Sequence, residues 1–189
     1  FACRVGGCGS CAMTVNGRAR WTCRTHVNEV IKNNHIKIAP LKSFKVIKDL
    51  AVDMDVFFTK LVKAKGAFIP TANRKDTLPR LSPNTKKRQA ASSGIECIGC
   101  GICYASCDVV KWNPDYLGPA ALNRAWTLVN DVRDGGNEKR LLAVSSETGC
   151  ISCHSQQGCT KSCPKHLNPA KSIAGLKRKT TWSLLTGKL

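Results

Sequence analysis

Eleven of the twelve cysteines fall into three groups with the close, regular spacing of metal-cluster ligands. The groups are Cys3, Cys8, Cys11 and Cys23; Cys97, Cys100, Cys103 and Cys107; and Cys153, Cys159 and Cys163. The third group would repeat the spacing of the second if position 156 were a cysteine, but Gln156 stands there. Soft thiolates in such sets are ligands of iron–sulfur clusters, and bound metal also fixes the fold of short chains.

The first group has the order Cys-x4-Cys-x2-Cys followed by a distant cysteine, which is the plant-type spacing for a [2Fe–2S] cluster. Gly6, Gly7 and Gly9 allow the loop to turn tightly and to bring backbone N–H groups near the sulfurs. The pair Asn16-Gly17 then predicts a hairpin between 12–15 and the run to Cys23, which returns the last ligand to the loop.

The second group has the Cys-x2-Cys-x2-Cys-x3-Cys spacing of bacterial ferredoxins, in which the fourth cysteine serves a neighbouring cluster. The simplest assignment gives four cysteines to a [4Fe–4S] cluster: Cys97, Cys100, Cys103 and Cys163. Three cysteines then remain for the neighbouring cluster: Cys107, Cys153 and Cys159. Because the amide of Gln156 is a poor iron ligand, this set suits a [3Fe–4S] cluster. Cys150 fits neither spacing and is interpreted as a small buried thiol.

Two other uses of cysteine compete with the cluster interpretation. Zinc ribbons also contain Cys-x2-Cys pairs, so a zinc protein that binds nucleic acid is an alternative. Zinc needs four ligands in two pairs, whereas the pairs here extend into triplets with a trailing Cys163-Pro164. A disulfide framework is typical of secreted chains, and no signal peptide is visible here.

With the groups in this order, the chain resembles the iron–sulfur subunits of succinate dehydrogenase and quinol:fumarate reductase. The resemblance covers nearly the whole chain. Five stretches carry it: Cys8-Gly9-Ser10-Cys11, Lys48-Asp49-Leu50-Ala51-Val52-Asp53, Gly118-Pro119-Ala120-Ala121, Asp131-Val132-Arg133-Asp134 and Cys163-Pro164-Lys165-His166-Leu167-Asn168-Pro169. The position at which the family lacks a cysteine in its third cluster falls on Gln156.

The resemblance implies an electron-transfer subunit with no bond-making chemistry of its own. In the family, three clusters carry electrons between FAD in a flavoprotein subunit and a quinone at membrane anchor subunits, which are the partners expected here. By resemblance, Trp112 and His154 belong to the quinone pocket, and their flat rings with polar tips suit that role. A buried core position is the alternative for Trp112. The alternative function is the iron–sulfur subunit of another flavin-dependent oxidoreductase.

The sequence departs from the family at a few points. Asp108 stands where the family usually has proline, and a carboxylate beside a cluster tends to lower its reduction potential. Lys111 stands where many relatives have an aromatic residue. Family members also have an upstream portion that supplies the first strands of the ferredoxin domain. We therefore expect a first domain that is incomplete at its N-terminus and weak alone.

The predicted fold class is α+β, with an N-terminal plant-type ferredoxin (β-grasp) domain and a mainly helical, bacterial-ferredoxin-like C-terminal domain. The boundaries are residues 1–45 for the [2Fe–2S] domain, 46–93 for a helix and a linker, and 94–189 for the helical domain. Within these, alternation over 35–38 predicts a strand and an apolar stripe predicts a helix over 49–65. Further helices are predicted over 118–133 and from Asn168 into the basic stretch 177–179.

The formal charge of +18 raises the question of nucleic-acid binding. Bound clusters would lower this charge, and the lysines and arginines are scattered, so no nucleic-acid partner is expected. Attraction to an anionic lipid surface or an acidic partner is favoured instead. No run approaches the eighteen apolar residues of a membrane helix. We therefore expect peripheral contact with a bacterial cytoplasmic membrane, on its cytoplasmic face, or with the mitochondrial inner membrane, on its matrix face.

Overall fold

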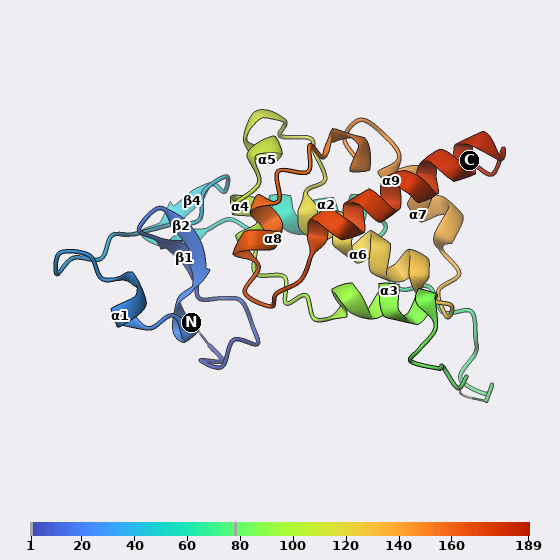
Figure 1. Cartoon of the computed structure of the whole chain (residues 1–189), viewed down its shortest axis with the longest axis horizontal. Helices are drawn as coiled ribbons and strands as arrows, with labels where there is room; N and C mark the ends of the chain where they lie inside the picture. Colours follow the sequence, from blue (N-terminus) through green and yellow to red (C-terminus); the bar gives the residue numbers. More distant parts are fainter. Residues whose placement is uncertain (1, 78) are drawn as a thin grey trace.

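The computed structural model describes residues 2–77 and 79–189, and it places a small region with strands and a larger helical region end to end (Figure 1). The first region holds five strands and two short helical turns: β1 (Ala12–Val15), β2 (Arg18–Trp21), η1 (Thr22–Arg24), α1 (Val27–Val30), β3 (Ile38–Ala39), β4 (Val46–Lys48) and β5 (Ala51–Val52). Separate strands and helices agree with the predicted α+β class at this coarse level.

The hairpin predicted at Asn16-Gly17 is confirmed. β1 and β2 pair antiparallel from Ala12 opposite Trp21 to Val15 opposite Arg18. Asn16 and Gly17 have φ values of 48° and 81°, as a two-residue turn between twisted strands requires. The strand predicted over 35–38 is shorter and later than expected, because β3 begins at Ile38 and pairs with β1.

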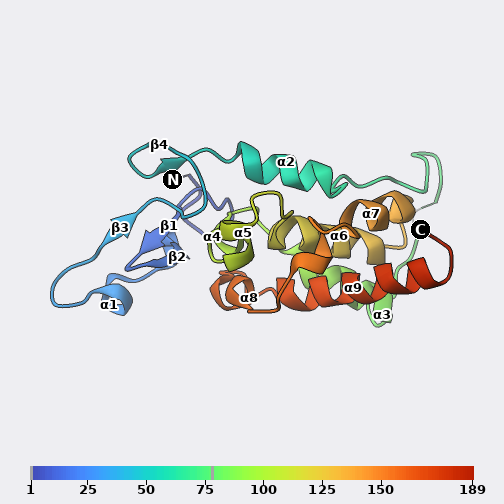
Figure 2. The ribbon, with the colours of Figure 1, turned by 90° about the horizontal axis from the view of Figure 1, so that it is seen from above.

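The helical region is built around α6, which is buried along most of its length. Its elements are α2 (Asp55–Lys63), α3 (Lys86–Ile95), α4 (Ile102–Ala105), α5 (Asp108–Trp112), α6 (Pro119–Asn130), α7 (Asn137–Val144), η2 (Cys150–Ser152), α8 (Gly158–Ser162) and α9 (Pro169–Leu185). Helices α2, α3, α7 and α9 pack around α6, with α2 on one side of it and α3 and α9 on the other (Figure 2). Small residues such as Ala121 and Ala125 let these helices approach closely.

The structure corrects one predicted helix and the linker that was expected after it. The helix predicted over 49–65 begins at Asp55, because the residues before it form the β4–β5 hairpin. Consequently Leu50 and Phe58 of the predicted apolar stripe are exposed, at 40% and 51%, whereas Phe57 is buried. The linker predicted up to residue 93 is not a linker throughout, because α3 begins at Lys86 and its N-cap Thr85 accepts the backbone N–H of Arg88.

Two helices were predicted to begin at a proline, and the structure confirms both starts. α6 begins at Pro119, although it ends at Asn130 rather than near 133. α9 begins at Pro169, and the Asn168 side chain caps it by accepting the backbone N–H of Lys171 at 2.9 Å. α9 then runs beyond the basic stretch to Leu185, which corrects its predicted end.

A buried ion pair fastens the segment after α2 to the helical region. Arg140 and Asp134 are both fully buried and lie 2.7 Å apart. Arg140 also donates to the carbonyls of Lys65 and Ala67, and Asp134 accepts the backbone N–H of Ile69. Each buried charge therefore has a partner of opposite sign and further hydrogen bonds, which such pairs need.

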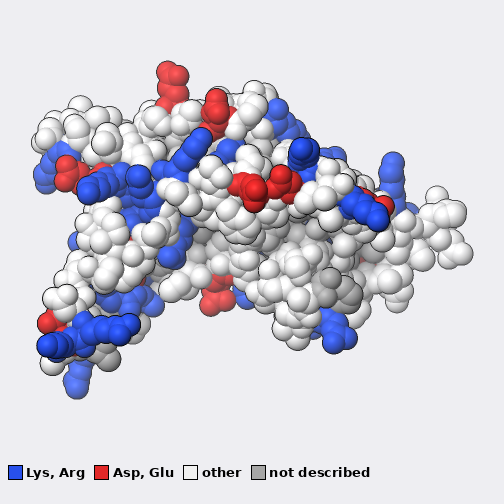
Figure 3. All heavy atoms as spheres, turned by 180° about the vertical axis from the view of Figure 1, so that it is seen from behind, with Lys and Arg blue, Asp and Glu red and all other residues white. Residues whose placement is uncertain are grey.

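Basic side chains are distributed over one face of the molecule rather than gathered in a single patch on it (Figure 3). On the face opposite to that of Figure 1, lysines and arginines occur in several separate groups, and acidic residues form a few isolated spots (Figure 3). This view agrees with the scattered charge of the sequence and shows a solvated basic surface on that face.

Candidate iron–sulfur sites

The first cysteine group lies around the β1–β2 hairpin, with three members in the loop before β1 and one after β2. Its members come from two elements: Cys3, Cys8 and Cys11 from the loop, and Cys23 from η1. The Sγ of Cys3 accepts the backbone N–H groups of Gly7 at 3.2 Å and Cys8 at 3.3 Å. The Sγ of Cys8 lies 3.1 Å from the Ser10 hydroxyl, and this contact is the main cause that lowers the pKa of Cys8 to about 6. Donors within the loop thus stabilise thiolate.

The hairpin returns Cys23 to this loop. Thr22, next to it, donates its backbone N–H at 3.2 Å and its hydroxyl at 2.9 Å to the carbonyl of Cys11. Desolvation raises the pKa of Cys23, followed by a hydrogen bond with Cys11 and by negative charge on Cys11 and Cys3. The bonds of Thr22 hold Cys23 beside Cys11, as the hairpin prediction required.

Four cysteines of the helical region line one cavity: Cys97, Cys100, Cys103 and Cys163. Most of the remaining lining is apolar or small, including Phe57, Ala120 and Leu167. Burial raises the pKa of Cys100 to about 11 and that of Cys103 well above its usual value. Negative charge on the other cysteines of the set raises both further. Thiolates gathered here need a cationic centre to offset their repulsion.

Three cysteines line a second cavity of the helical region: Cys107, Cys153 and Cys159. Gln156 and His154 line the same cavity. Burial raises the pKa of Cys159 to about 11, and charge on Cys107 and Cys153 raises it too. The structure therefore gathers the predicted three-cysteine set together with the glutamine that interrupts the motif. Soft sulfur donors in a protein-lined cavity fit an iron–sulfur cluster in both places.

Contacts link the three groups in order. A Cβ added to Gly9, in the first loop, would lie 2.7 Å from the Cβ of Cys100, so the first loop touches the second group. Helix α4, which holds Cys103, packs against α8, which holds Cys159, so the second and third groups are neighbours as well. The three groups thus form a continuous series through the molecule.

Trp112 and His154 form an aromatic pair beside the three-cysteine cavity. Their ring centroids lie 5.9 Å apart with an interplanar angle of 86°. Trp112, at the end of α5, is 61% exposed, which excludes the buried core position considered for it. His154 directly follows Cys153 and is exposed as well.

Among residues 2–77 and 79–189, no three or more His, Cys, Asp or Glu side chains are arranged to hold a single metal ion.

Comparison with known proteins identifies two domains that match the cysteine groups. Residues 1–59 match the 2Fe-2S iron-sulfur cluster binding domain, and residues 96–168 match the 4Fe-4S dicluster domain. The chain is 40% identical to the mitochondrial succinate dehydrogenase [ubiquinone] iron-sulfur subunit 1 of Oryza sativa, over 94% of its own length. It is 32% identical to the fumarate reductase iron-sulfur subunit of Haemophilus influenzae, over 92% of its own length and 71% of that subunit.

The chain belongs to the family of succinate dehydrogenase and fumarate reductase iron–sulfur subunits. The family resemblance drawn from the cysteine pattern is therefore confirmed. The chain spans 63% of the length of the rice subunit. A chain of the Mycobacterium smegmatis Sdh1 complex, solved in the apo form, has the same fold, with a TM-score of 0.81 at 24% identity. That match covers 96% of this chain and 76% of the other.

The two departures from the family at α5 pair with each other. Lys111 and Asp108 form an ion pair one turn apart, with both side chains half exposed. Charge on Asp108 contributes to the raised pKa of Cys107. The lysine therefore offsets part of the charge that the aspartate places next to this cysteine.

Cys150 is fully buried, and its Sγ lies 3.7 Å from the Thr180 hydroxyl. This environment agrees with the interpretation of Cys150 as a small buried thiol.

Two residues near the three-cysteine cavity were missed from the sequence. Tyr116 lines the cavity, and the amine of Lys177 donates to the carbonyl of Cys153 at 2.7 Å. The sequence indicates Lys177 only as a cation near a helix end, because the packing of α9 against η2 is not visible in its periodicity. Tyr116 lies in the loop between α5 and α6, where no periodic pattern indicates burial.

Proposed function

We propose that this chain is the iron–sulfur subunit of a succinate:quinone oxidoreductase and relays electrons between the FAD of a flavoprotein subunit and a membrane quinone. The observation that carries this proposal is the continuous series of cysteine groups: Gly9 approaches Cys100, and α4, which holds Cys103, packs against α8, which holds Cys159. Membership of the family supports it. A series of one-electron centres in contact is what electron transfer across a subunit needs.

Each cysteine group is proposed to hold one cluster. The [2Fe–2S] cluster would be bound in a plant-type β-grasp domain by Cys3, Cys8, Cys11 and Cys23. The [4Fe–4S] cluster would be bound by Cys97, Cys100, Cys103 and Cys163. The [3Fe–4S] cluster would be bound by Cys107, Cys153 and Cys159, with Gln156 in place of a fourth ligand. When bound, the clusters supply one-electron transfer.

The residues around the cavities support this assignment. Phe57, Ala120 and Leu167 limit access of water to the four-cysteine cavity, and exclusion of water is one of the factors that set a cluster potential. The raised pKa values of Cys100 and Cys103 mean that these thiols ionise when iron binds rather than before. The protein thus holds and insulates the clusters but makes or breaks no bond of the substrate.

The quinone is proposed to bind at Trp112 and His154. Both are exposed, and His154 also lines the three-cysteine cavity, so a quinone placed against this pair would lie next to the last cluster. The indole N–H and the imidazole can each hydrogen-bond a quinone carbonyl.

The surface that continues from this site is proposed to meet the membrane anchor subunits. Ile151, Trp182 and Leu185 are 56%, 67% and 77% exposed, and η2, which holds Ile151, packs against α9, which holds the other two. Helix α5 and the C-terminal end of α9 lie along one edge of the molecule (Figure 1). Exposed apolar side chains on elements that pack against each other are typical of a docking surface.

Membrane contact is proposed to be peripheral and made through these anchors, on the cytoplasmic face of a bacterial membrane or the matrix face of the mitochondrial inner membrane. No described helix combines the length and the apolar character that spanning a bilayer requires.

Low-temperature electron paramagnetic resonance on the assembled complex, with iron and sulfide quantified on the same sample, tests this function. We expect a three-iron signal in the oxidised complex and a [2Fe–2S] signal after succinate is added. A cluster-loaded complex that succinate does not reduce would point to another flavin-dependent oxidoreductase. A colourless protein with zinc and no acid-labile sulfide would contradict the proposal altogether.

A further inference from the structure

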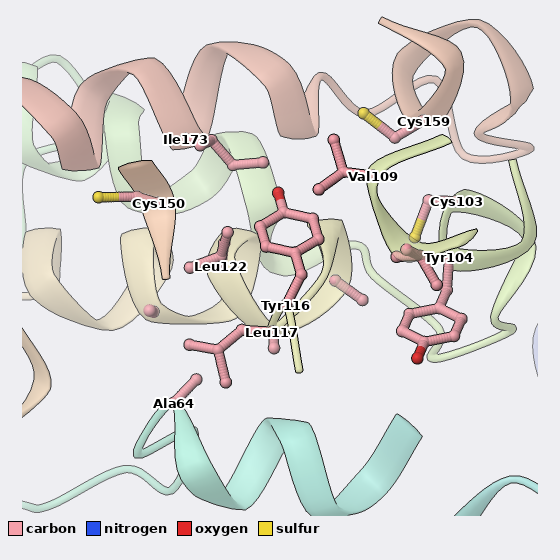
Figure 4. Close-up of a cluster of buried hydrophobic side chains, with 14 of the residues drawn as sticks. Ala64, Cys103, Tyr104, Val109, Tyr116, Leu117, Leu122, Cys150, Cys159 and Ile173 are labelled. Carbon is pink, nitrogen blue, oxygen red and sulfur yellow. The ribbon is translucent and has the colours of Figure 1, made fainter. Parts of the chain in front are cut away.

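The chain has two tyrosines, both buried, and their hydroxyl groups point in opposite directions. Tyr104 follows Cys103 directly, and its hydroxyl points toward α2, away from Cys159 (Figure 4). There it accepts a hydrogen bond of 2.8 Å from the amine of Lys60, which is 5% exposed. Tyr116 points the other way, with its hydroxyl directed between Val109 and Ile173 (Figure 4). The hydroxyl of Tyr104 is thus engaged outside the cysteine cavities.

The hydroxyl of Tyr116 faces the three-cysteine cavity. Tyr116 is 1% exposed, and the residues on either side of its hydroxyl, Val109 and Ile173, line this cavity together with the three cysteines. A buried phenol hydroxyl needs an acceptor. A tyrosine hydroxyl can donate one hydrogen bond, and the acceptors that line this cavity with it include the sulfurs of the three cysteines.

The backbone around Tyr116 fixes its position. The Tyr116 N–H donates to the carbonyl of Asn113 at 3.2 Å, and the N–H of Leu117 donates to the carbonyl of Thr148 at 2.7 Å. The second bond joins this loop to the segment that leads into η2 and Cys153. The donor and the sulfur are thus held by connected backbone, which lowers the cost of ordering the contact.

We propose that Tyr116 donates a hydrogen bond to the sulfur of Cys153 and thereby raises the reduction potential of the [3Fe–4S] cluster. The inference rests on the cluster assignment made under the proposed function. Reduction adds one negative charge to the cluster, part of which resides on the ligand sulfurs. A donor aimed at such a sulfur stabilises the reduced state more than the oxidised state.

The two cavities of the helical region differ in this respect. The described residues that line the four-cysteine cavity include no hydroxyl side chain, and the hydroxyl of nearby Tyr104 is held by Lys60. Tyr116 therefore raises the potential of one cluster selectively. With the higher potential, the [3Fe–4S] cluster holds the electron more often than it otherwise would. This is the cluster nearest the proposed quinone site.

The test compares Tyr116→Phe with Tyr104→Phe in the assembled complex. Redox titration followed by electron paramagnetic resonance gives the midpoint potential of each cluster. We expect Tyr116→Phe to lower the reduced-to-oxidised ratio of the [3Fe–4S] cluster about tenfold at a fixed potential, which is a shift of about 59 mV. The [4Fe–4S] potential should not move, and Tyr104→Phe should leave the [3Fe–4S] potential unchanged. An unchanged potential in Tyr116→Phe, or an equal shift in Tyr104→Phe, overturns the proposal.

A second measurement on the wild-type complex covers the case in which Tyr116→Phe does not assemble. After exchange into deuterium oxide, pulsed electron paramagnetic resonance should detect an exchangeable deuteron coupled to the oxidised three-iron cluster. If the three-iron signal is normal but no such deuteron is detected, the proposed hydrogen bond from Tyr116 is overturned and the cluster assignment stands. A wild-type complex with full iron content but no three-iron signal overturns the cluster assignment and, with it, the role of Tyr116.

Discussion

The first cysteine group lies in a loop, whereas the other two lie in helical cavities. The two regions accommodate the negative charge of cysteine thiolates by different means. In the loop, Cys8 is exposed, and donors beside it lower its pKa to about 6. In the helical region, Cys103 is buried, and its pKa is raised well above the usual value. The loop stabilises thiolates with its own N–H and hydroxyl groups. In the cavities, bound iron is expected to stabilise the thiolates instead.

This difference assigns different structural roles to the clusters. The first loop is held by a hairpin and by its own hydrogen bonds, so its shape depends less on the metal. The helical cavities bring negatively charged thiolates together in a desolvated space. Their repulsion is offset only when iron is bound. The clusters of the helical region are therefore expected to contribute more to folding than the cluster of the loop.

The largest effect is expected from Cys103→Ser, compared with Cys8→Ser. A hard serine oxygen replaces a buried thiolate, so Cys103→Ser should abolish the [4Fe–4S] cluster and remove about four irons per chain. The helical region should also lose its cooperative unfolding transition. Cys8→Ser should disturb only the [2Fe–2S] signal. Iron analysis, paramagnetic resonance and calorimetry on the same complexes measure these effects, and equal losses of structure in both variants would remove the distinction between the two regions.

The next prediction concerns the interrupted motif in the three-cysteine cavity. Gln156→Cys places a fourth thiolate in the cavity that Cys107, Cys153 and Cys159 line, so a [4Fe–4S] cluster should form there. The oxidised three-iron signal should disappear, and iron should rise by about one per chain. Gln89→Cys, on the exposed face of α3, is the matched control and should leave the signal intact. Persistence of the three-iron signal under anaerobic, iron-replete conditions would falsify the assigned ligand geometry.

A third prediction compares two arginine–aspartate pairs of the helical region. Arg140→Met leaves Asp134 as an unpaired buried charge and frees the segment after α2, so it should cost about 3–5 kcal/mol in unfolding free energy. Arg133→Met breaks the pair with Asp131, in which the arginine side chain is 42% exposed and the carboxylate 8% exposed, and should cost less, about 1–3 kcal/mol. Denaturant unfolding of the assembled complex measures both. Similar costs would show that the buried pair does not fasten this segment.

The two cysteine sets that line the helical cavities were predictable because both runs of cysteines follow the regular spacing of a known ligand motif. The hairpin at Asn16-Gly17 and the starts of α6 and α9 were also predictable, since turns and caps act over a few residues. The helix expected over 49–65 was wrong at its start because the apolar residues before Asp55 serve a hairpin instead. An apolar stripe cannot distinguish these uses by itself.

Contacts between distant segments could not be read from the chain. Tyr116 reaches the cavity only because the loop before α6 packs beside η2, and Arg140 binds carbonyls more than seventy residues away in sequence. The exposure of Trp112 likewise depends on how α5 is placed. Spacing identifies which cysteines can share a cluster, whereas tertiary packing determines which other side chains surround it.

The smallest difference between paired variants is expected where the two regions touch. Gly9 and Gly17 both have left-handed backbone, with φ of 74° and 81°, so alanine at either should cost about 1–2 kcal/mol in conformational strain. A Cβ at Gly17 would meet no atom within 4 Å, whereas one at Gly9 would lie 2.8 Å from the Cα of Cys100. Gly9→Ala should therefore cost about 1–3 kcal/mol more, from overpacking against backbone.

The same contact predicts a functional difference between these two variants. Alanine at position 9 must push the first loop away from Cys100, so electrons should pass more slowly from the [2Fe–2S] to the [4Fe–4S] cluster. Gly17→Ala should leave that rate unchanged, because its turn faces open space. Rapid-freeze paramagnetic resonance after addition of succinate follows the two clusters separately. If both variants were destabilised equally and transferred electrons at the wild-type rate, the close approach of Gly9 would have no part in joining the two regions.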